Sequence, residues 1–274
     1  MRIRQYTLIF VWSIIIALPA AAATKEETRV ADATHVLDQF LRIPEQSIPP
    51  RLLSRAFGVA VIPSVIKIGF GLGARRGKGI LVVRQRDGSW SNPSFVTLTG
   101  GSFGFQVGAQ STDIILVFKT RKSVDGIANG KLTLGADASV AAGPVGRHAA
   151  AATDARFRSE VFSYSRSRGL FAGVALEGAG ITMDRKANAA FYSSASITPE
   201  QIFAGSSNAA PQAANTFVQV LTTKTNQLPM RPGMKSAATS ASSALQEKSE
   251  VRTYGYGTSD DALDSGLQKP HRQH

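Results

Sequence analysis

A run of basic side chains stands out first, because no acid lies among them between residues 75 and 86. Its five members are Arg75, Arg76, Lys78, Arg84 and Arg86. The segment before and among them, from Gly69 to Gly79, is rich in glycine. Backbone N–H groups freed by glycines form, together with Arg and Lys, a suitable cradle for phosphate. The residues therefore predict an anion-binding segment, and a solvated basic hairpin is the alternative.

The same glycines do not fit a nucleotide loop. A dinucleotide loop needs the spacing G-x-G-x-x-G, and the position of its third glycine is Arg76. A P-loop needs Ser or Thr after its lysine, and Gly79 follows Lys78. We therefore expect no nucleotide cofactor.

Residues for catalysis or metal binding are sparse. Ser64 and Lys67 match an S-x-x-K pattern, but the companion motifs S-D-N and K-T-G are absent. There is no cysteine, and no two of the four histidines have the spacing of metal ligands. We expect a protein that is not an enzyme and that needs neither a metal nor another cofactor.

The net charge of +12 points to an anionic partner, and most of the excess lies between residues 24 and 205. Two further basic groups contribute to it. They are Lys119, Arg121 and Lys122, and Arg156, Arg158, Arg166 and Arg168 around Phe157, Phe162 and Tyr164. Cations alternating with aromatics suit either nucleic acid or a lipid headgroup region. We expect phospholipid and no nucleic acid, because the N-terminus predicts export; core packing is the alternative role for the aromatics.

The first 23 residues have the pattern of a signal peptide. Arg2 and Arg4 precede an apolar run, Pro19 ends it, and the small residues 21–23 suit a cleavage site. The run is shorter than the ~20 residues that span a bilayer. We expect an exported protein, periplasmic or secreted and peripherally attached to a membrane, and a retained anchor is the alternative.

Elements that would position the basic run follow from local patterns. Thr24 and Glu27 fit a capping box at the start of a helix over residues 24–42, and Pro49 and Pro50 open a short second helix. That first helix has an apolar face suited to the core, and a membrane-lying helix is the alternative. Short β-branched runs with glycines and a turn at Asp87-Gly88 follow. They predict an α+β fold, predominantly an antiparallel β-sheet of sandwich or barrel type behind N-terminal helices.

Composition suggests three segments. Residues 1–23 form the signal peptide, residues 24–205 the lipid-binding domain, and residues 206–274 a low-complexity tail of Ala, Ser, Thr, Gln and Pro. Too little apolar surface remains in the tail to offset chain entropy, so we expect it to be largely disordered.

A family resemblance covers residues 48 to 192. The stretch resembles the SYLF domain, also called the Las17-binding or actin-patch type. The matching phrases are Arg55 to Pro63, Lys67 to Phe70, Gly77 to Gly79, Asp87 to Phe95, Phe103 to Gly108, Leu134 to Ala138, Ala142 to Arg147, Tyr164 to Gly173 and Asn188 to Tyr192.

The resemblance implies a domain that binds phospholipid membranes, favouring phosphoinositides in eukaryotes, and some fungal members bind actin. Mapped onto this chain, it places Lys67 in a matching motif, beside the cations of the glycine-rich loop. We therefore expect Lys67, Arg75, Arg76, Lys78, Arg84 and Arg86 to bind anionic, phosphoinositide-like lipid headgroups. The alternative is a structural or protein-interaction module of the cell envelope with an actin-like or envelope protein partner.

Overall fold

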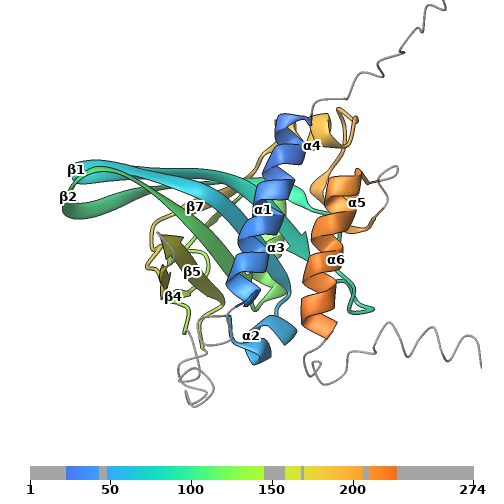
Figure 1. Ribbon diagram of the computed structural model, residues 1–274, viewed down its shortest axis with the longest axis horizontal. Coiled ribbons are helices and arrows are strands. Elements are labelled where there is room, and N and C mark those ends of the chain that lie inside the picture. The colour runs from blue at the N-terminus through green and yellow to red at the C-terminus, as the bar shows by residue number, and fades with distance from the viewer. Residues whose placement is uncertain (1–22, 43–47, 145–157, 168–169, 206–209, 227–274) are drawn as a thin grey trace, which may run out of the picture.

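A computed structural model describes residues 23–42, 48–144, 158–167, 170–205 and 210–226. Six helices and seven strands occur within these ranges (Figure 1). In chain order they are α1 (Lys25–Arg42), α2 (Pro50–Ser54), β1 (Gly58–Val83), β2 (Ser94–Phe118), α3 (Arg121–Ala128), β3 (Lys131–Thr133), β4 (Val140–Ala142), β5 (Val161–Ser167), β6 (Leu170–Gly173), β7 (Gly180–Met183), α4 (Arg185–Phe191), α5 (Pro199–Phe203) and α6 (Gln212–Asn226). The signal-peptide prediction for residues 1–23 lies almost wholly outside the described residues.

The strands form one curled sheet that is mostly antiparallel. Its path runs β3-β7-β2-β5-β4, with β1 pairing β2 and β6 pairing β5. The pairing of β4 with β5 is parallel, and the other pairings are antiparallel. The predicted α+β class with a barrel-like antiparallel sheet is confirmed.

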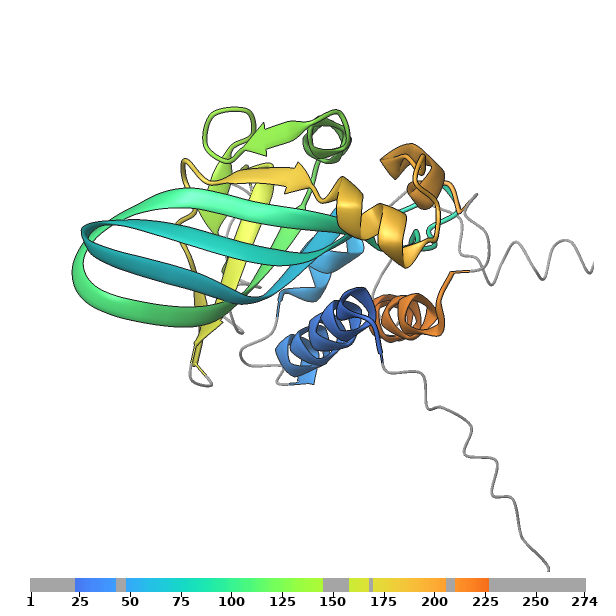
Figure 2. The same ribbon diagram turned by 90° about the horizontal axis from the view of Figure 1, so that it is seen from above.

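Strands β1 and β2 are far longer than the sequence indicated, at 26 and 25 residues. Several glycine-separated runs that read as individual strands are parts of these two. Both strands bend at the far end of the sheet and return (Figure 2), so that the N–H of Arg84 donates to the carbonyl of Phe57 at 2.8 Å. The glycine-rich segment from Gly69 to Gly79, expected as a loop, is strand, because glycines without side chains let a paired strand bend.

Glycine is required where the two halves of β1 meet. A Cβ on Gly79 would lie 2.2 Å from the carbonyl oxygen of Val61, and one on Gly77 would lie 2.6 Å from a methyl group of Val65. Both distances are shorter than any contact a real Cβ makes, so the sheet closes on itself only because these residues lack side chains.

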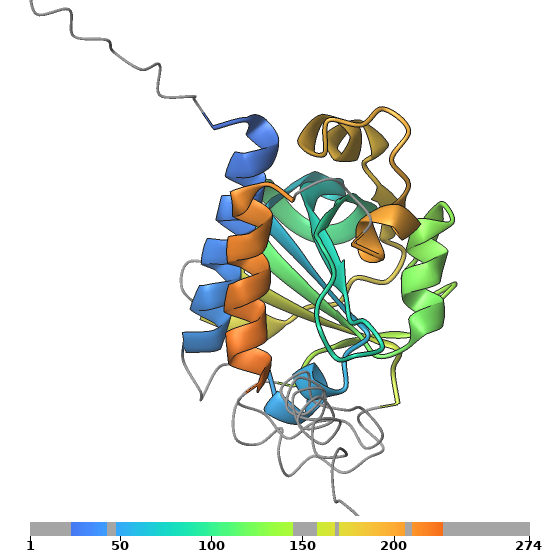
Figure 3. The ribbon, with the colours of Figure 1, turned by 90° about the vertical axis from the view of Figure 1, so that its right-hand side faces the viewer.

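Two hydrophobic clusters form the core, one on each face of β1. Val59 and Val61 belong to the first cluster, whereas Ala60 and Ile62 belong to the second, as strand alternation requires. Helices α1 and α6 lie side by side over the first cluster, and α3 lies on the other side of the molecule (Figure 3). The base of the sheet is therefore buried on both faces.

Local signals placed the N-terminal helices correctly. The capping box of α1 is present, with the N–H of Thr24 donating to Glu27 at 2.8 Å and the N–H of Glu27 donating to the Thr24 hydroxyl at 3.1 Å. The apolar face of α1 packs into the first core cluster, which confirms the core-packing interpretation and contradicts the membrane-lying alternative.

Helix α6 extends the folded unit beyond residue 205, where composition had placed the start of the tail. Ala214, Phe217 and Leu221 are fully buried in the first core cluster against α1. The polar residues between them lowered the mean hydropathy of the segment, although the apolar spacing is helical. The remainder of the predicted tail, residues 227–274, lies outside the described residues.

The tight turn between β1 and β2 is confirmed at its predicted place. Gly88 has a φ of +88°, and the N–H of Ser89 donates to the Asp87 carboxylate at 2.9 Å. No helix within the described ranges has the length and hydropathy to cross a membrane.

Candidate anion-binding surface on the β1–β2 ribbon

The far part of β1 and β2 is a two-stranded ribbon that extends beyond the rest of the sheet. Strand β2 pairs with β7 as far as Thr99 and with β5 from Asp113, and between these points the described strands give it only β1 as a partner. We call residues 64–76 of β1 and 99–112 of β2 the ribbon end. Figure 1 shows it extending away from α1 and α6.

The charge of this ribbon is one-sided. Strand β1 carries four cations and no acid, and β2 carries one acid, Asp113, and no cation. The Asp113 carboxylate accepts a hydrogen bond from the N–H of Ser64 at 3.0 Å, at a register shift where Ser64 has a φ of +49°. The only carboxylate of the two strands therefore already binds the backbone at an irregularity of β1.

Lys67 and Arg76 are the accessible cations of the ribbon end. Lys67 is partly exposed opposite Gln110, and Arg76 is exposed opposite Thr99. Neither forms an ion pair with a carboxylate in the described parts of the chain. Both charges are thus free to meet an anion from solution.

Arg75 lies beside them but points toward the protein. Its guanidinium donates to the carbonyl of Ala175 at 3.1 Å. Burial lowers the pKa of Arg75, and the nearby Glu177 carboxylate opposes this effect. Arg75 therefore contributes positive charge to the ribbon end, but its guanidinium is already bound to the protein and is less free to contact a ligand.

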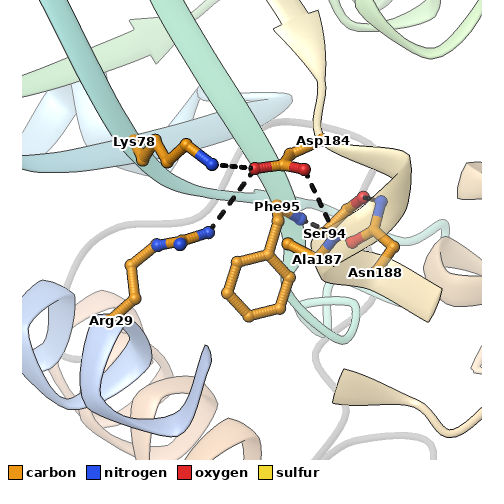
Figure 4. A network of polar contacts seen from close by, with 7 residues as sticks. All are labelled: Arg29, Lys78, Ser94, Phe95, Asp184, Ala187 and Asn188. Carbon is orange, nitrogen blue, oxygen red and sulfur yellow. Dashed lines mark hydrogen bonds and ion pairs between the residues drawn. The ribbon is translucent and has the colours of Figure 1, made fainter. Parts of the chain in front are cut away.

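Lys78 is held in an ion-pair network (Figure 4). Its ammonium lies 3.0 Å from Oδ2 of Asp184, and Arg29 of α1 lies 3.7 Å from the same oxygen. Burial raises the pKa of Asp184. The hydrogen bonds from Lys78 and from the N–H of Ala187, with the charges of Lys78 and Arg29, outweigh burial and leave the pKa below its usual value.

The network continues into the backbone of β2. Oδ1 of Asp184 caps α4 by accepting from the N–H of Ala187 at 3.2 Å. One turn on, Asn188 accepts from the N–H of Phe95 at 2.7 Å and donates to the Ser94 hydroxyl at 3.0 Å (Figure 4). Lys78 and Asp184 therefore connect β1, α1, α4 and β2, and the sequence-predicted role of Lys78 as a free headgroup ligand competes with this structural role.

Arg84 and Arg86 lie at the base of the sheet, away from the ribbon end. Arg84 is buried; it donates to the carbonyls of Ala56, Leu53 and Gly88 and stacks over the Trp90 ring at 4.2 Å from the ring centroid. Arg86 is exposed in the turn after β1. Lys67, Arg75 and Arg76 therefore belong to the ribbon end, whereas Arg84 and Arg86 lie outside it.

Sequence reasoning missed two apolar residues beside the cations. Ile66 and Ile68 are 50% and 60% exposed, and neither of them was singled out from the sequence. No local sequence pattern indicates their exposure, because it depends on how far β1 extends past its neighbouring strands.

A groove lies at the base of the sheet. Its volume is about 1040 Å³, and Phe57, Trp90, Phe203, Arg86, Arg121 and Glu200 contribute to its walls. The aromatic and charged side chains come from the residue before β1, from the turn after β1, from α3 and from α5. A segment of another protein fits such a mixed surface better than a lipid headgroup does, because it offers both apolar and charged groups.

The remaining sequence-predicted groups divide between core and surface. Phe162 and Tyr164 are buried, so the core interpretation of these aromatics is confirmed, and burial raises the pKa of Tyr164. Arg156, Phe157 and Arg168 lie outside the described residues. Within the described ranges, no three His, Asp or Glu side chains gather as ligands for a metal ion.

Comparisons with known proteins agree on one family. The family profile described as "Ysc84: Las17-binding protein actin regulator" matches residues 99–224. Protein YSC84 of Saccharomyces cerevisiae is 39% identical over 211 residues, which are 74% of this chain and 44% of the yeast protein. LAS seventeen-binding protein 3 of the same species is 39% identical over 195 residues, which cover 68% of this chain and 42% of that protein.

An animal relative shows the same similarity. SH3 domain-containing YSC84-like protein 1 of Homo sapiens is 38% identical over 180 residues, which are 64% of this chain and 52% of the human protein. The chain therefore spans about half the length of the curated relatives that it matches.

Proposed function

The chain belongs to the Ysc84, or SYLF, family, and we propose that it binds anionic phospholipid surfaces peripherally through the ribbon end. Phosphate-bearing, phosphoinositide-like headgroups are the chemistry that this surface suits. We place the membrane in the cell envelope or outside the cell, following the signal-peptide pattern of residues 1–23.

One observation carries the proposal: β1 bears four cations without a single acid, and two of them, Lys67 and Arg76, form no ion pair with any carboxylate in the part of the chain that the structure describes. Each cation held near an anionic membrane contributes about 1 kcal/mol to binding. Lys67 and Arg76 together therefore account for an affinity difference of about thirty-fold. Arg75 lends its charge from a half-buried position.

The experiment is vesicle flotation with neutral phosphatidylcholine vesicles and with vesicles that also contain phosphatidylglycerol or cardiolipin. We expect the wild-type chain to float with the anionic vesicles and to lose about thirty-fold in affinity on Lys67→Ala/Arg76→Ala. Equal recovery with neutral and anionic vesicles contradicts the proposal.

A matched control removes two exposed cations elsewhere. Lys122 on α3 and Lys131 on β3 are exposed, and Lys122→Ala/Lys131→Ala changes the net charge by the same amount. All variants share residues 1–23, so differences between them report on the ribbon end and not on the apolar leader. An equal loss in both double variants contradicts a local surface and indicates a response to net charge alone.

A second candidate function is recognition of a protein partner. The family is described as a Las17-binding protein and actin regulator, and one relative is LAS seventeen-binding protein 3. The groove of about 1040 Å³ with aromatic walls favours it. Co-sedimentation with filamentous actin tests this candidate. Binding that persists at high salt and is lost on Phe203→Ser supports it, because exposed ion pairs weaken with salt while apolar contacts do not.

We propose binding without catalysis. The Ser64 and Lys67 pair of the S-x-x-K pattern lies on an irregular part of a strand, where the N–H of Ser64 is bound to Asp113. A hydrolysis assay with generic ester substrates gives no turnover above background under this proposal.

A further inference from the structure

Two isoleucines on the ribbon end face water. Of the large apolar side chains that the structure describes, only Ile66 and Ile68 are exposed, at 50% and 60%. Both belong to the same strand and stand two residues apart. Because successive side chains of a strand alternate between faces, the two lie next to each other on one face of β1.

The position of this pair follows from the register. Val65, immediately before Ile66, is buried in the second core cluster, so Ile66 and Ile68 face away from that core. Their cross-strand partners are Ser111 and Ala109, which are both exposed and small. Small neighbours leave the two isoleucine side chains standing above the surface of the ribbon.

Exposing two apolar side chains to water at the end of a ribbon is unfavourable in free energy, and it favours association with another surface. The same part of β1 carries two accessible cations. Arg76 lies on the returning half of the strand, and Lys67 projects from the face opposite the two isoleucines, because it stands between them in the sequence. Apolar side chains next to Lys and Arg are the combination that suits the boundary between lipid headgroups and acyl chains.

We propose that Ile66 and Ile68 insert into the acyl-chain boundary of an anionic bilayer while Arg76 contacts its phosphates and Lys67 adds positive charge from the other face of the strand. The inference rests on the proposed function and deepens it by naming an apolar anchor. Figure 1 shows the ribbon end extending beyond the helices, so that α1 and α6 do not stand between it and a flat surface.

Charge favours a bilayer over a second copy of this chain as the occupant. Pairing two ribbon ends through their isoleucines brings Lys67 and Arg76 of one copy near those of the other, and like charges repel at such distances. An anionic membrane instead neutralises the same cations while it buries the isoleucines.

The absence of cysteine from the sequence makes a clean depth measurement possible. An environment-sensitive fluorophore is attached to Ile68→Cys, and the same label on Ala190→Cys, an exposed position on α4, serves as the control. With vesicles of phosphatidylcholine and phosphatidylglycerol, we expect a blue shift and quenching by acyl-chain-labelled lipid at position 68 and neither at position 190. A label at position 68 that stays in water while the protein is vesicle-bound overturns the inference.

Affinity provides the second readout. A half-exposed isoleucine that becomes buried changes partitioning by about ten-fold, so Ile66→Ser/Ile68→Ser should weaken vesicle binding by about a hundred-fold. The control Ala190→Ser should leave it unchanged. Because both isoleucines are already exposed, the variants should keep the circular dichroism and melting temperature of the wild type.

The outcomes separate the two proposals. If the wild-type chain does not distinguish anionic from neutral vesicles, the proposed function fails and the inference fails with it. If the wild type prefers anionic vesicles but the isoleucine variant binds equally well, only the inference fails. If the isoleucine variant changes the oligomeric state in light scattering and leaves vesicle affinity unchanged, the pair mediates self-association and the inference is overturned.

Discussion

The ammonium of Lys78 lies 3.0 Å from Oδ2 of Asp184, across 106 residues of sequence. Asp184 is only 12% exposed, and it also accepts the cap bond of α4 and faces Arg29 of α1. A single carboxylate therefore ties the returning half of β1 to two helices, which fixes where the ribbon leaves the body of the protein.

Replacing this carboxylate should destabilise the fold. Asp184→Asn keeps the shape and the capping oxygen but leaves two cations without their counter-charge, so we expect a loss of about 1–3 kcal/mol in the free energy of unfolding. Urea denaturation measures it. Asp38→Asn is the control, because Asp38 pairs with an Arg42 side chain that is 70% exposed. This substitution should lower the free energy of unfolding by less than about 0.5 kcal/mol. If the two variants lose equal amounts of unfolding free energy, the stabilising role assigned to Asp184 is contradicted.

The contribution of Asp184 should depend on pH with a defined sign. Its pKa is lower in the folded protein than in the unfolded chain, because the charged form gains Lys78 and Arg29 as partners. Its stabilisation is therefore fully present above the unfolded pKa of about 3.9 and disappears as the pH falls through the lower folded value. We expect the gap in urea midpoint between wild type and Asp184→Asn to be constant from pH 7 to pH 5 and to narrow toward pH 3. If the difference in urea midpoint between wild type and Asp184→Asn does not narrow toward pH 3, the ion pair is not the source of that difference.

Arg84 should matter for stability and not for membrane binding. Its guanidinium donates to three backbone carbonyls and stacks on Trp90, a geometry that a lysine ammonium does not reproduce. We expect Arg84→Lys to lower the free energy of unfolding by about 2 kcal/mol although the charge is kept. Arg86→Ala, which removes an exposed cation from the same turn, should change it by less than about 0.5 kcal/mol. A larger loss of unfolding free energy in Arg86→Ala than in Arg84→Lys, measured by chemical denaturation, contradicts this prediction.

The bend of β1 depends on glycine at position 79. A methyl group there would overlap the carbonyl oxygen of Val61, so Gly79→Ala should cost more than about 2 kcal/mol or prevent folding. Gly101→Ala is the matched control, since a Cβ on Gly101 meets no atom within 4 Å. Thermal unfolding of the two variants decides the matter, and a Gly79→Ala protein as stable as the wild type shows that the two halves of β1 do not meet there.

Elements with short-range signals could be predicted from the sequence. The capping box of Thr24 and Glu27 and the Asp87-Gly88 turn act over two or three residues, so their residue types alone specify them. The length of β1 and β2 could not be predicted, because glycines that interrupt an apolar run look the same in a loop and in a bent strand.

The candidate site was only partly accessible to sequence reasoning for a related reason. A basic run is visible as a run, but its members face different surroundings: Arg84 is buried under backbone carbonyls, Lys78 faces Asp184, and Arg76 faces solvent. These environments arise from segments up to about a hundred residues away, which no local pattern encodes. The exposure of Ile66 and Ile68 has the same origin.

The most direct test of the central claim is the affinity of the wild-type chain and of Lys67→Ala/Arg76→Ala for phosphatidylglycerol vesicles, measured by equilibrium titration at low and at high salt. We predict that the wild type binds about thirty-fold more tightly than the variant at low salt and that the difference shrinks as salt screens the charges. Equal affinities for wild type and variant at low salt contradict the claim that the ribbon end binds the membrane.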